Sequence, residues 1–141
     1  MSRTLPLIVQ TILYKKKDDD FLVLLLKRTE DRGGFWNTVN GTLEINESAI
    51  ECRERELREE AGVVGVNSWT AELHRFAFNY KDAVFSVIVF GAEASKGQGI
   101  KLNEEHTEYA WVSFPVAGSM LKFDDDKLAL KKCHELLLTN S

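Results

Sequence analysis

The sequence predicts an α/β protein in which a mixed central β-sheet is covered by helices on both faces, an α/β/α sandwich. Three observations carry this prediction. Apolar, β-branched runs typical of strands occur both before and after a capped helix, the last segment has the pattern of an amphipathic helix, and no internal repeat or low-complexity linker interrupts the chain. At 141 residues the chain can bury one full core, so we expect a single domain over residues 1–141.

The strands are separated by polar turns. We expect strands over residues 5–14, 21–27, 35–40, 68–80 (with a break), 83–93 and 109–114. The charged stretch 15–20 is predicted to be the solvated tip of the first hairpin. A short helix is expected to open at Pro115, and an amphipathic helix is expected over residues 126–138, with Leu128, Leu130, Leu136 and Leu137 as its apolar positions.

The central helix has clear start and stop residues. Ser48 and Glu51 have the spacing of a capping box, in which the hydroxyl accepts from the third helical amide and the carboxylate reaches back. The helix is therefore expected to begin near Ala49 and to stop at Gly62, which tolerates the left-handed conformation of a helix end. Ile50, Leu57 and Ala61 form its predicted core stripe.

Three carboxylates lie on this helix, off the predicted core stripe. Glu56, Glu59 and Glu60 fall at positions i, i+3 and i+4, so their side chains project within an arc of about 100°. Negative groups this close repel one another unless a cation lies between them, and clusters of oxygen ligands suit Mg²⁺ or Mn²⁺. The pattern indicates metal-assisted cleavage of a phosphate-containing substrate.

The segment 41–63 resembles the Nudix box: a glycine, five residues, a glutamate, seven residues, then Arg-Glu-aliphatic-x-Glu-Glu-x-Gly-aliphatic. Every fixed position is filled, by Gly41, Glu47, Arg55, Glu56, Leu57, Glu59, Glu60, Gly62 and Val63. The resemblance implies the Nudix α/β/α sandwich and a hydrolase that cleaves a nucleoside diphosphate linked to another group.

The same resemblance assigns roles inside the box. It implies that Glu56, Glu59 and Glu60 are metal ligands and that the Gly41 carbonyl completes the shell around Mg²⁺ or Mn²⁺. Arg55 is expected to orient these carboxylates and to offset their repulsion. Glu47 either pairs with Arg55 or binds metal through water, and Glu44 is a further acid near the site. The alternative is a solvated helix with ordinary ion pairs such as Glu51–Arg55 and Arg55–Glu59.

A catalytic base is expected outside the box. Many family members draw a further glutamate from a separate loop, and Glu104, Glu105 and Glu108 lie in or beside the polar loop that precedes the last predicted strand. Glu105 is the choice, because its distance from Trp111 is similar to the acid-to-tryptophan spacing of the dihydroneopterin triphosphate pyrophosphatase subfamily.

Substrate binding requires an aromatic platform and cationic groups for phosphate. Phe35 and Trp36 precede the strand that delivers Gly41, and Arg28 ends a strand that leads to the same loop. Tyr80 lies seventeen residues beyond the box, close to where dinucleoside polyphosphate hydrolases commonly carry a tyrosine. For each single aromatic residue, ordinary core packing is the competing interpretation.

These features favour a nucleoside triphosphate as the substrate, split into a monophosphate and pyrophosphate. Hydrolysis of a dinucleoside polyphosphate is the second hypothesis, and a Nudix-like sensor that binds a nucleotide without turnover is the third. The sensor is disfavoured because such domains tend to lose acids from the box and this chain has lost none. Isomerisation of a diphosphate needs further catalytic residues, including a cysteine, that have no match here.

Composition limits the partners. The net charge is −4, and basic residues are mixed with acids, which argues against duplex nucleic acid and leaves a small nucleotide as the expected partner. No apolar run is long enough to span a membrane, and no secretory signal is evident, so we expect a cytoplasmic protein. Cys52 and Cys133 are expected to be free thiols. The sequence does not decide whether the protein forms a homodimer.

Overall fold

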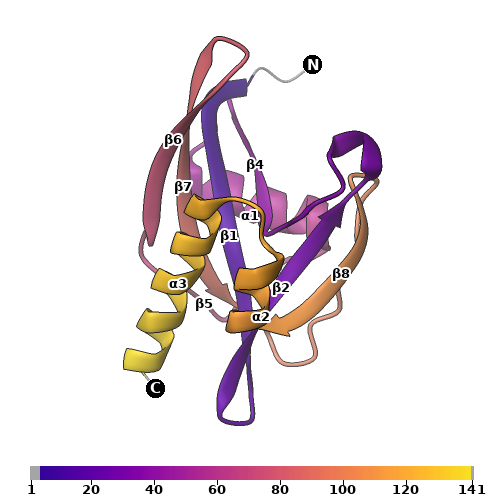
Figure 1. The fold of residues 1–141 in the computed structure, drawn as a ribbon, viewed down its shortest axis with the longest axis vertical. Helices are drawn as coiled ribbons and strands as arrows, with labels where there is room; N and C mark the ends of the chain where they lie inside the picture. Colours follow the sequence, from indigo (N-terminus) through magenta and orange to yellow (C-terminus); the bar gives the residue numbers. More distant parts are fainter. Residues whose placement is uncertain (1–3, 141) are drawn as a thin grey trace.

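A computed structural model describes residues 4–140, and within this range eight strands form one mixed sheet with three α-helices around it (Figure 1). The elements are β1 (Thr4–Lys17), β2 (Asp20–Arg28), the 3₁₀-helix η1 (Glu30–Arg32), β3 (Trp36–Asn37), β4 (Val39–Glu44), α1 (Ala49–Ala61), β5 (Ser68–Trp69), β6 (His74–Tyr80), β7 (Ala83–Glu93), β8 (His106–Ser113), α2 (Phe114–Met120) and α3 (Asp124–Thr139). The predicted α/β/α sandwich is confirmed.

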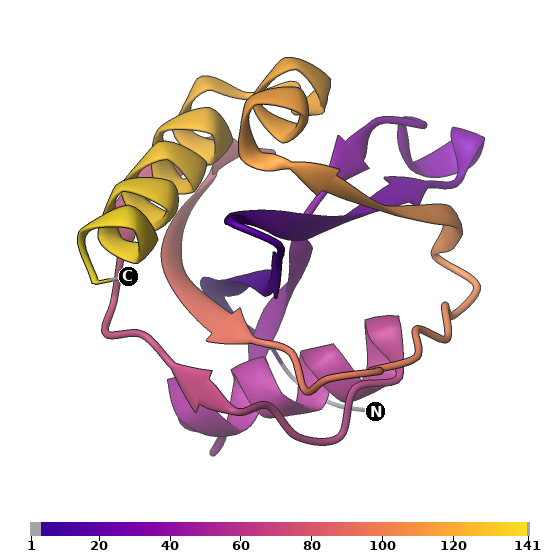
Figure 2. The ribbon, with the colours of Figure 1, turned by 90° about the horizontal axis from the view of Figure 1, so that it is seen from below.

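Strand β1 is the centre of the sheet. It runs parallel to β7 and antiparallel to β2 and β4. β2 in turn pairs with β3 and β8, and β7 pairs with β5 and β6. Figure 2 shows α1 on one side of the sheet and α2 with α3 on the other. None of the helices within residues 4–140 combines the length and the apolar composition that a membrane span needs.

The apolar strands are buried on both faces, as expected for a sheet between two helical layers. Side chains alternate along each strand. Ile12, Val23 and Leu25 therefore pack toward α2 and α3, whereas Leu13 and Leu24 pack toward α1. This alternation holds α1 against β1 and β4, which is the contact that builds the candidate site.

Several predicted boundaries are corrected by the structure. The strand expected over residues 35–40 is two pieces, and the second continues to Glu44. β8 starts at His106 rather than at residue 109, because this segment pairs with the end of β2. The first hairpin extends to Lys17, so the turn is shorter than predicted. The expected break within residues 68–80 is confirmed.

The predicted core stripe of α1 is wrong at Ile50, which is 54% exposed, and Leu128 of α3 is likewise exposed. The prediction is confirmed at Leu57 and Ala61, and Cys52, Glu56 and Glu60 complete the buried side of α1. Glu56 and Glu60 were expected to lie off this stripe, but both are buried. The helix turns them toward β4, where a glycine leaves space for one of them.

Candidate active site

Helix α1 begins and ends as the sequence predicts. The Glu51 amide donates to Ser48 Oγ at 3.0 Å, and the Ser48 amide donates to Glu51 Oε1 at 2.9 Å. At the other end Gly62 has φ of 70°, and its amide donates to the Arg58 carbonyl at 3.1 Å. These caps fix the length of the helix, and they therefore fix which side chains meet β4.

Gly41 leaves room for the side chain of Glu56. In β4, Gly41 lies opposite Val9 of β1 and faces the carboxyl group of Glu56. A Cβ atom at position 41 would collide with that carboxyl group. The glycine of the motif is thus explained by close approach between a strand backbone and a helical carboxylate.

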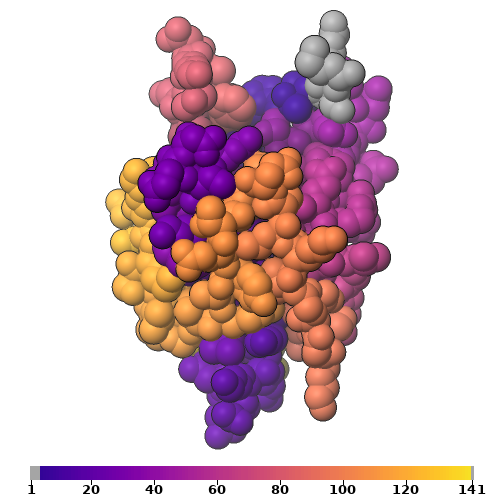
Figure 3. Space-filling view, turned by 90° about the vertical axis from the view of Figure 1, so that its right-hand side faces the viewer, coloured from indigo at the N-terminus to yellow at the C-terminus, as the bar shows by residue number. Residues whose placement is uncertain are grey.

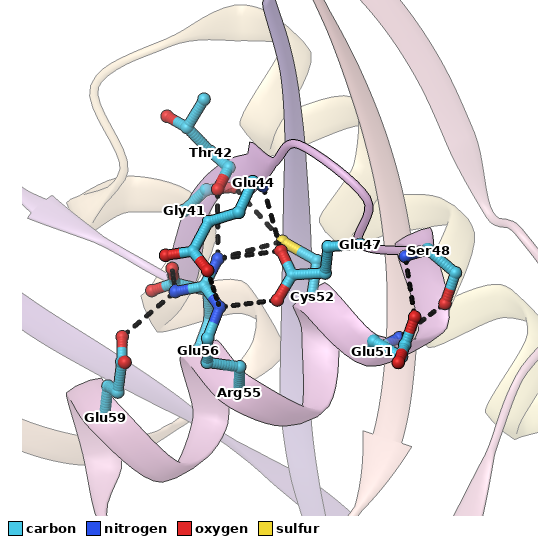
Figure 4. A network of polar contacts seen from close by, with 10 residues as sticks. All are labelled: Gly41, Thr42, Glu44, Glu47, Ser48, Glu51, Cys52, Arg55, Glu56 and Glu59. Carbon is cyan, nitrogen blue, oxygen red and sulfur yellow. Dashed lines mark hydrogen bonds and ion pairs between the residues drawn. The ribbon is translucent and has the colours of Figure 1, made fainter. Parts of the chain in front are cut away.

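Arg55 is the centre of the polar network drawn in Figure 4. Its Nε and NH2 donate to the two carboxylate oxygens of Glu47 at 2.6 and 3.0 Å. Its NH1 donates to Glu56 at 2.6 Å and to Glu59 at 3.0 Å, and NH2 also reaches the Thr42 carbonyl at 3.1 Å. A planar guanidinium group can hold several carboxylates at once in this way. The geometry matches the orienting role predicted for Arg55.

The predicted pairing of Glu47 with Arg55 is confirmed. Hydrogen bonds from Arg55 lower the pKa of Glu47 to about 2 despite partial burial, and the carboxylates around Arg55 raise the pKa of its guanidinium in turn. Glu47 is therefore ionised across the physiological range. Glu44 lies farther out, with 3.8 Å between its Oε1 and Arg55 Nε.

Glu56 and Glu60 are both buried, and their carboxyl groups are the most perturbed part of the site. Burial is the main cause that raises the pKa of each well above its ordinary value, and the charges of neighbouring acids, including Glu105, add to it. Arg55 opposes the shift at Glu56, and the Asn40 amide opposes it at Glu60, with an N–O distance of 3.3 Å.

This set of donors fits a hard divalent cation. Two buried carboxyl groups whose pKa values are raised ionise more readily beside an added cation, and carboxylate and carbonyl oxygens are the ligands that Mg²⁺ and Mn²⁺ prefer. Within residues 4–140 no three His, Cys, Asp or Glu side chains are already arranged to hold one ion. Glu59 explains part of this, because its half-exposed side chain is turned to Arg55.

Cys52 lies in the same network. Its thiol contacts the Gly41 carbonyl, with an S–O distance of 3.8 Å, and burial raises its pKa to about 12. The thiol is therefore protonated at neutral pH. Cys52 and Cys133 are both buried and free, as predicted.

The loop that carries Glu105 is fastened to the site at two points. The Lys101 amide donates to the Ala61 carbonyl at the end of α1 at 2.8 Å, and the Thr29 amide donates to the Glu105 carbonyl at 3.1 Å. The Glu105 carboxylate contacts Arg32 and the Asn103 amide group, each at 3.2 Å. Glu105 is close enough to raise the pKa values of Glu56 and Glu60.

The other two candidate acids differ from Glu105. Glu108 lies in β8 and pairs with Lys27, with 3.6 Å between Nζ and Oε2. Glu104 is exposed at the turn before β8. Of the three acids, Glu105 is the one whose charge raises the pKa values of Glu56 and Glu60.

The predicted substrate-binding residues occupy three different environments. Arg28 lies over the ring of Phe35, 5.3 Å from its centroid, so these two are brought together. Trp36 is half-buried and packs against the core on the side of α2. Tyr80 is 55% exposed on the β6–β7 hairpin, which projects from the body of the protein in Figure 1.

A buried polar cluster between the sheet and α3 was missed by the sequence reasoning. The Gln10 amide donates to Thr38 Oγ1 at 2.7 Å and to Asp126 Oδ1 at 3.2 Å. Outside this cluster, Asn37 of β3 is 4% exposed, and its Oδ1 has no hydrogen-bond partner among the described residues. Burial raises the pKa of Asp126. The available signal was a set of polar residues that interrupt apolar strands, Gln10 above all.

Comparison with known proteins identifies the class to which this fold and site belong. The model of the NUDIX domain matches residues 4–132. The chain is 30% identical over 114 residues to nucleoside triphosphatase NudI of Escherichia coli O139:H28, with 73% of this chain and 81% of NudI covered. It is also 30% identical over 132 residues to an octanoyltransferase of Myxococcus xanthus, of which it spans only 35% while 88% of this chain is covered.

Two solved structures have the same fold. An Ap4A hydrolase of C. elegans in a binary complex gives a TM-score of 0.84 at 19% identity, covering 94% of this chain and 98% of that one. The E. coli dihydroneopterin triphosphate pyrophosphohydrolase gives 0.78 at 21% identity, covering 100% of both chains. The chain belongs to the NUDIX family. With its nucleoside triphosphatase relatives, this places it among the hydrolases that act on phosphorus-containing anhydrides.

Proposed function

We propose that this protein is a Mg²⁺-dependent pyrophosphohydrolase that splits a nucleoside triphosphate into a nucleoside monophosphate and pyrophosphate. One observation carries the proposal: the carboxyl groups of Glu56 and Glu60 are both buried on α1, with Glu56 against Gly41 and hydrogen-bonded to Arg55, and burial together with neighbouring acids raises the pKa of both. A structural helix has no reason to bury two neighbouring acids, whereas a site for a hard cation requires it.

In this proposal Glu56, Glu59, Glu60 and the Gly41 carbonyl hold the cation. When bound there, Mg²⁺ or Mn²⁺ supplies a Lewis acid that neutralises phosphate charge and lowers the pKa of a bound water. The residues of the chain do the rest. Arg55 holds Glu56 and Glu59 in place, and Glu47 fixes Arg55 through both of its oxygens.

Glu105 is the proposed catalytic base. Its position on a loop fastened to the end of α1 supports this role, as does its electrostatic influence on Glu56 and Glu60. A carboxylate there can accept the proton of the attacking water. Arg32 and Asn103 hold the Glu105 carboxylate by hydrogen bonds to its two oxygens.

Arg28 and Phe35 are proposed to bind the substrate, Arg28 through phosphate and Phe35 through its ring. Lys122 adds a second cation, 5.3 Å from the ring centroid of Phe35. Asn37 and the cluster around Gln10 and Asp126 supply buried donors and acceptors that can distinguish one base edge from another. Trp36 is proposed to pack beneath the substrate-binding residues and not to stack on a base, because its partly buried ring packs against the hydrophobic core.

A dinucleoside polyphosphate is the second candidate substrate, favoured by Tyr80. Its exposed ring contacts Phe85 edge to face at 6.4 Å, and Phe78 stacks on Phe85 at 5.6 Å. Three aromatic rings on a projecting hairpin can hold a second nucleoside. The likeness to the C. elegans Ap4A hydrolase supports only the shared fold at 19% identity, so this candidate ranks below the triphosphate.

The experiment that tests the proposal is turnover of a nucleotide panel with Mg²⁺, with products identified by chromatography. We expect a monophosphate among the products, no turnover in excess chelator, and recovery when Mg²⁺ or Mn²⁺ is restored. Glu59→Gln should reduce kcat by about a hundredfold or more while the protein stays folded, since the side chain is half exposed. Full activity of Glu59→Gln or in excess chelator would falsify the metal assignment. Tight binding without turnover across the panel would instead favour a nucleotide sensor.

We also propose that residues 1–141 work as one domain in a reducing compartment, the cytoplasm. Two free, buried thiols and the absence of any spanning helix within residues 4–140 support this proposal. Fractionation of cells that express the protein, followed by detection with an antibody, tests it. Recovery in an exported or membrane fraction would overturn it.

A further inference from the structure

A cavity forms where strands β1 and β7 part. The two strands pair in parallel as far as Tyr14 and Glu93, and the Ala94 amide makes the last bond, to the Tyr14 carbonyl, at 2.8 Å. Beyond this point β1 continues into the hairpin with β2, whereas the chain after β7 turns away over residues 95–98. Figure 3 shows these two segments as separate projections at the bottom of the view, with a hollow between them.

The hollow has the size of a small-molecule site. Its volume is about 620 Å³, within the range of ligand pockets in proteins. Of the described residues that line it, four are lysines and one is an acid. The charged residues and the aromatic residue of the wall are Lys15, Lys16, Lys17, Lys96, Glu93 and Trp111.

The residues that line this cavity have a positive net charge, whereas the chain as a whole has a negative one. The protein carries a net charge of −4, yet the described residues that line the cavity include four lysines and one acid. The Asp18, Asp19 and Asp20 carboxylates at the hairpin tip do not line it. Asp20 is turned to α3, with 3.7 Å between its Oδ1 and His134 Nε2. Like charges at short distance repel, so a bound anion would stabilise this arrangement.

One lysine is already held in place. Lys15 Nζ lies 4.2 Å from the centre of the Trp111 ring, a cation–π contact between β1 and β8. This contact covers one face of the indole and fixes the ammonium group at the cavity wall. A ligand therefore meets a positioned charge rather than a stacking surface, which favours a compact anion over a flat aromatic ring.

The cavity is separate from the acidic site. Gly41 lies opposite Val9 on β1, and Lys15 is six residues farther along the same strand, about 20 Å away at the rise of a β-strand. The two sites also differ in the sign of their charged residues: lysines line the cavity, and acids form the other site. An anion bound at the lysines therefore needs no divalent cation, whereas one at the acidic site does.

We propose that this cavity binds a small phosphate-bearing anion, such as inorganic pyrophosphate or the phosphate chain of a metabolite, independently of divalent metal. Phosphate groups fit because each carries more than one negative charge and several acceptor oxygens, which several ammonium groups can share. The hydrolytic activity proposed above is not required for this binding.

Titration with pyrophosphate in the presence of a chelator tests the proposal, with heat measured by calorimetry and sites located by amide NMR shifts. We expect saturable binding, with shifts at residues 96–98 and at the Trp111 indole and not at residues 41 and 42. The double variant Lys15→Gln/Lys96→Gln should bind at least about tenfold more weakly, and the charge-matched control Lys127→Gln/Lys131→Gln, on the exposed side of α3, should stay within about twofold of the wild type.

The single variant Lys96→Glu controls for a folding defect of the double variant, because Lys96 lies on an exposed turn where a substitution has little effect on folding. It should still weaken binding about tenfold. The proposal is overturned if the wild type shows no saturable binding in chelator. It is equally overturned if the double variant and its control bind alike, or if the shifts map to the acidic site.

Discussion

The Arg55 network of α1 and the loop that carries Glu105 are both parts of the candidate site, but they are built in opposite ways. Each hydrogen bond of Arg55 joins residues at most 13 positions apart, and the helix caps fix the geometry. Glu105 has one local partner, Asn103, but its other contacts are with Arg32, 73 positions away, and with Thr29. The difference shows that a sequence motif can specify a local network, whereas the partner that completes the site depends on how distant segments meet.

The largest expected effect concerns Glu105, the part of the site that long-range contacts place. Glu105→Gln keeps the shape of the side chain and removes its charge, so kcat should fall by about a hundredfold or more with little change in KM. Glu104→Gln and Glu108→Gln should each change kcat by less than about threefold. Steady-state kinetics on the best substrate of the panel gives the measurement.

Two outcomes would break the assignment of the base. If Glu104→Gln is the damaging change and Glu105→Gln is mild, the register of the loop is wrong by one residue. If all three variants are mild, the proton acceptor lies elsewhere, and the two regions are not parts of one catalytic site.

A second prediction tests the network around α1, through the contact between Gly41 and Glu56. Gly41→Ala places a Cβ against the Glu56 carboxyl group, which is the flexible end of a side chain and can swing aside. Because a small displacement of a ligand weakens catalysis strongly, activity should fall by about tenfold to a hundredfold. The free energy of unfolding should fall by only about 1 kcal/mol, as measured by urea denaturation.

Gly65→Ala is the matched control, since a Cβ there meets open space. It should leave both activity and stability near the wild-type values. Equal loss of activity in the two variants would show that the contact between β4 and Glu56 has no special part in the site.

The smallest expected effect concerns pH and the Glu47–Arg55 pair. The pKa of Glu47 is lowered from 4.5 to about 2, so this carboxylate stabilises the folded state above its ordinary pKa, and this contribution is lost as the pH falls toward about 2. Wild type should therefore be more stable than Glu47→Gln at neutral pH, and the difference should shrink between pH 4.5 and about 2.

Urea denaturation at several pH values measures this difference, with Glu54→Gln, an exposed acid of the same helix, as the baseline. A stability difference that does not change over this range would contradict the proposed strength of the pair.

Much of the fold followed from patterns within short segments. The capping box at Ser48, the glycine stop at Gly62 and the apolar strands were visible in the sequence and are confirmed. The family was also identified from one segment of the chain. The assignments to Ile50 and Leu128 were wrong because helical periodicity gives the direction of a side chain but not whether another element covers it there.

The sequence by itself determined the length of α1, the contacts among Arg55 and its acids, and the chemistry of the donors, because these depend on neighbours within a few turns of chain. Only the tertiary structure decided that Glu56 and Glu60 are buried, that the charge of Glu105 acts on them, and that Gln10 meets Asp126 across 116 positions. It also decided where β1 and β7 part and leave the lysine-lined cavity. Burial and long-range contact depend on how strands and helices stack, and no local spacing encodes that.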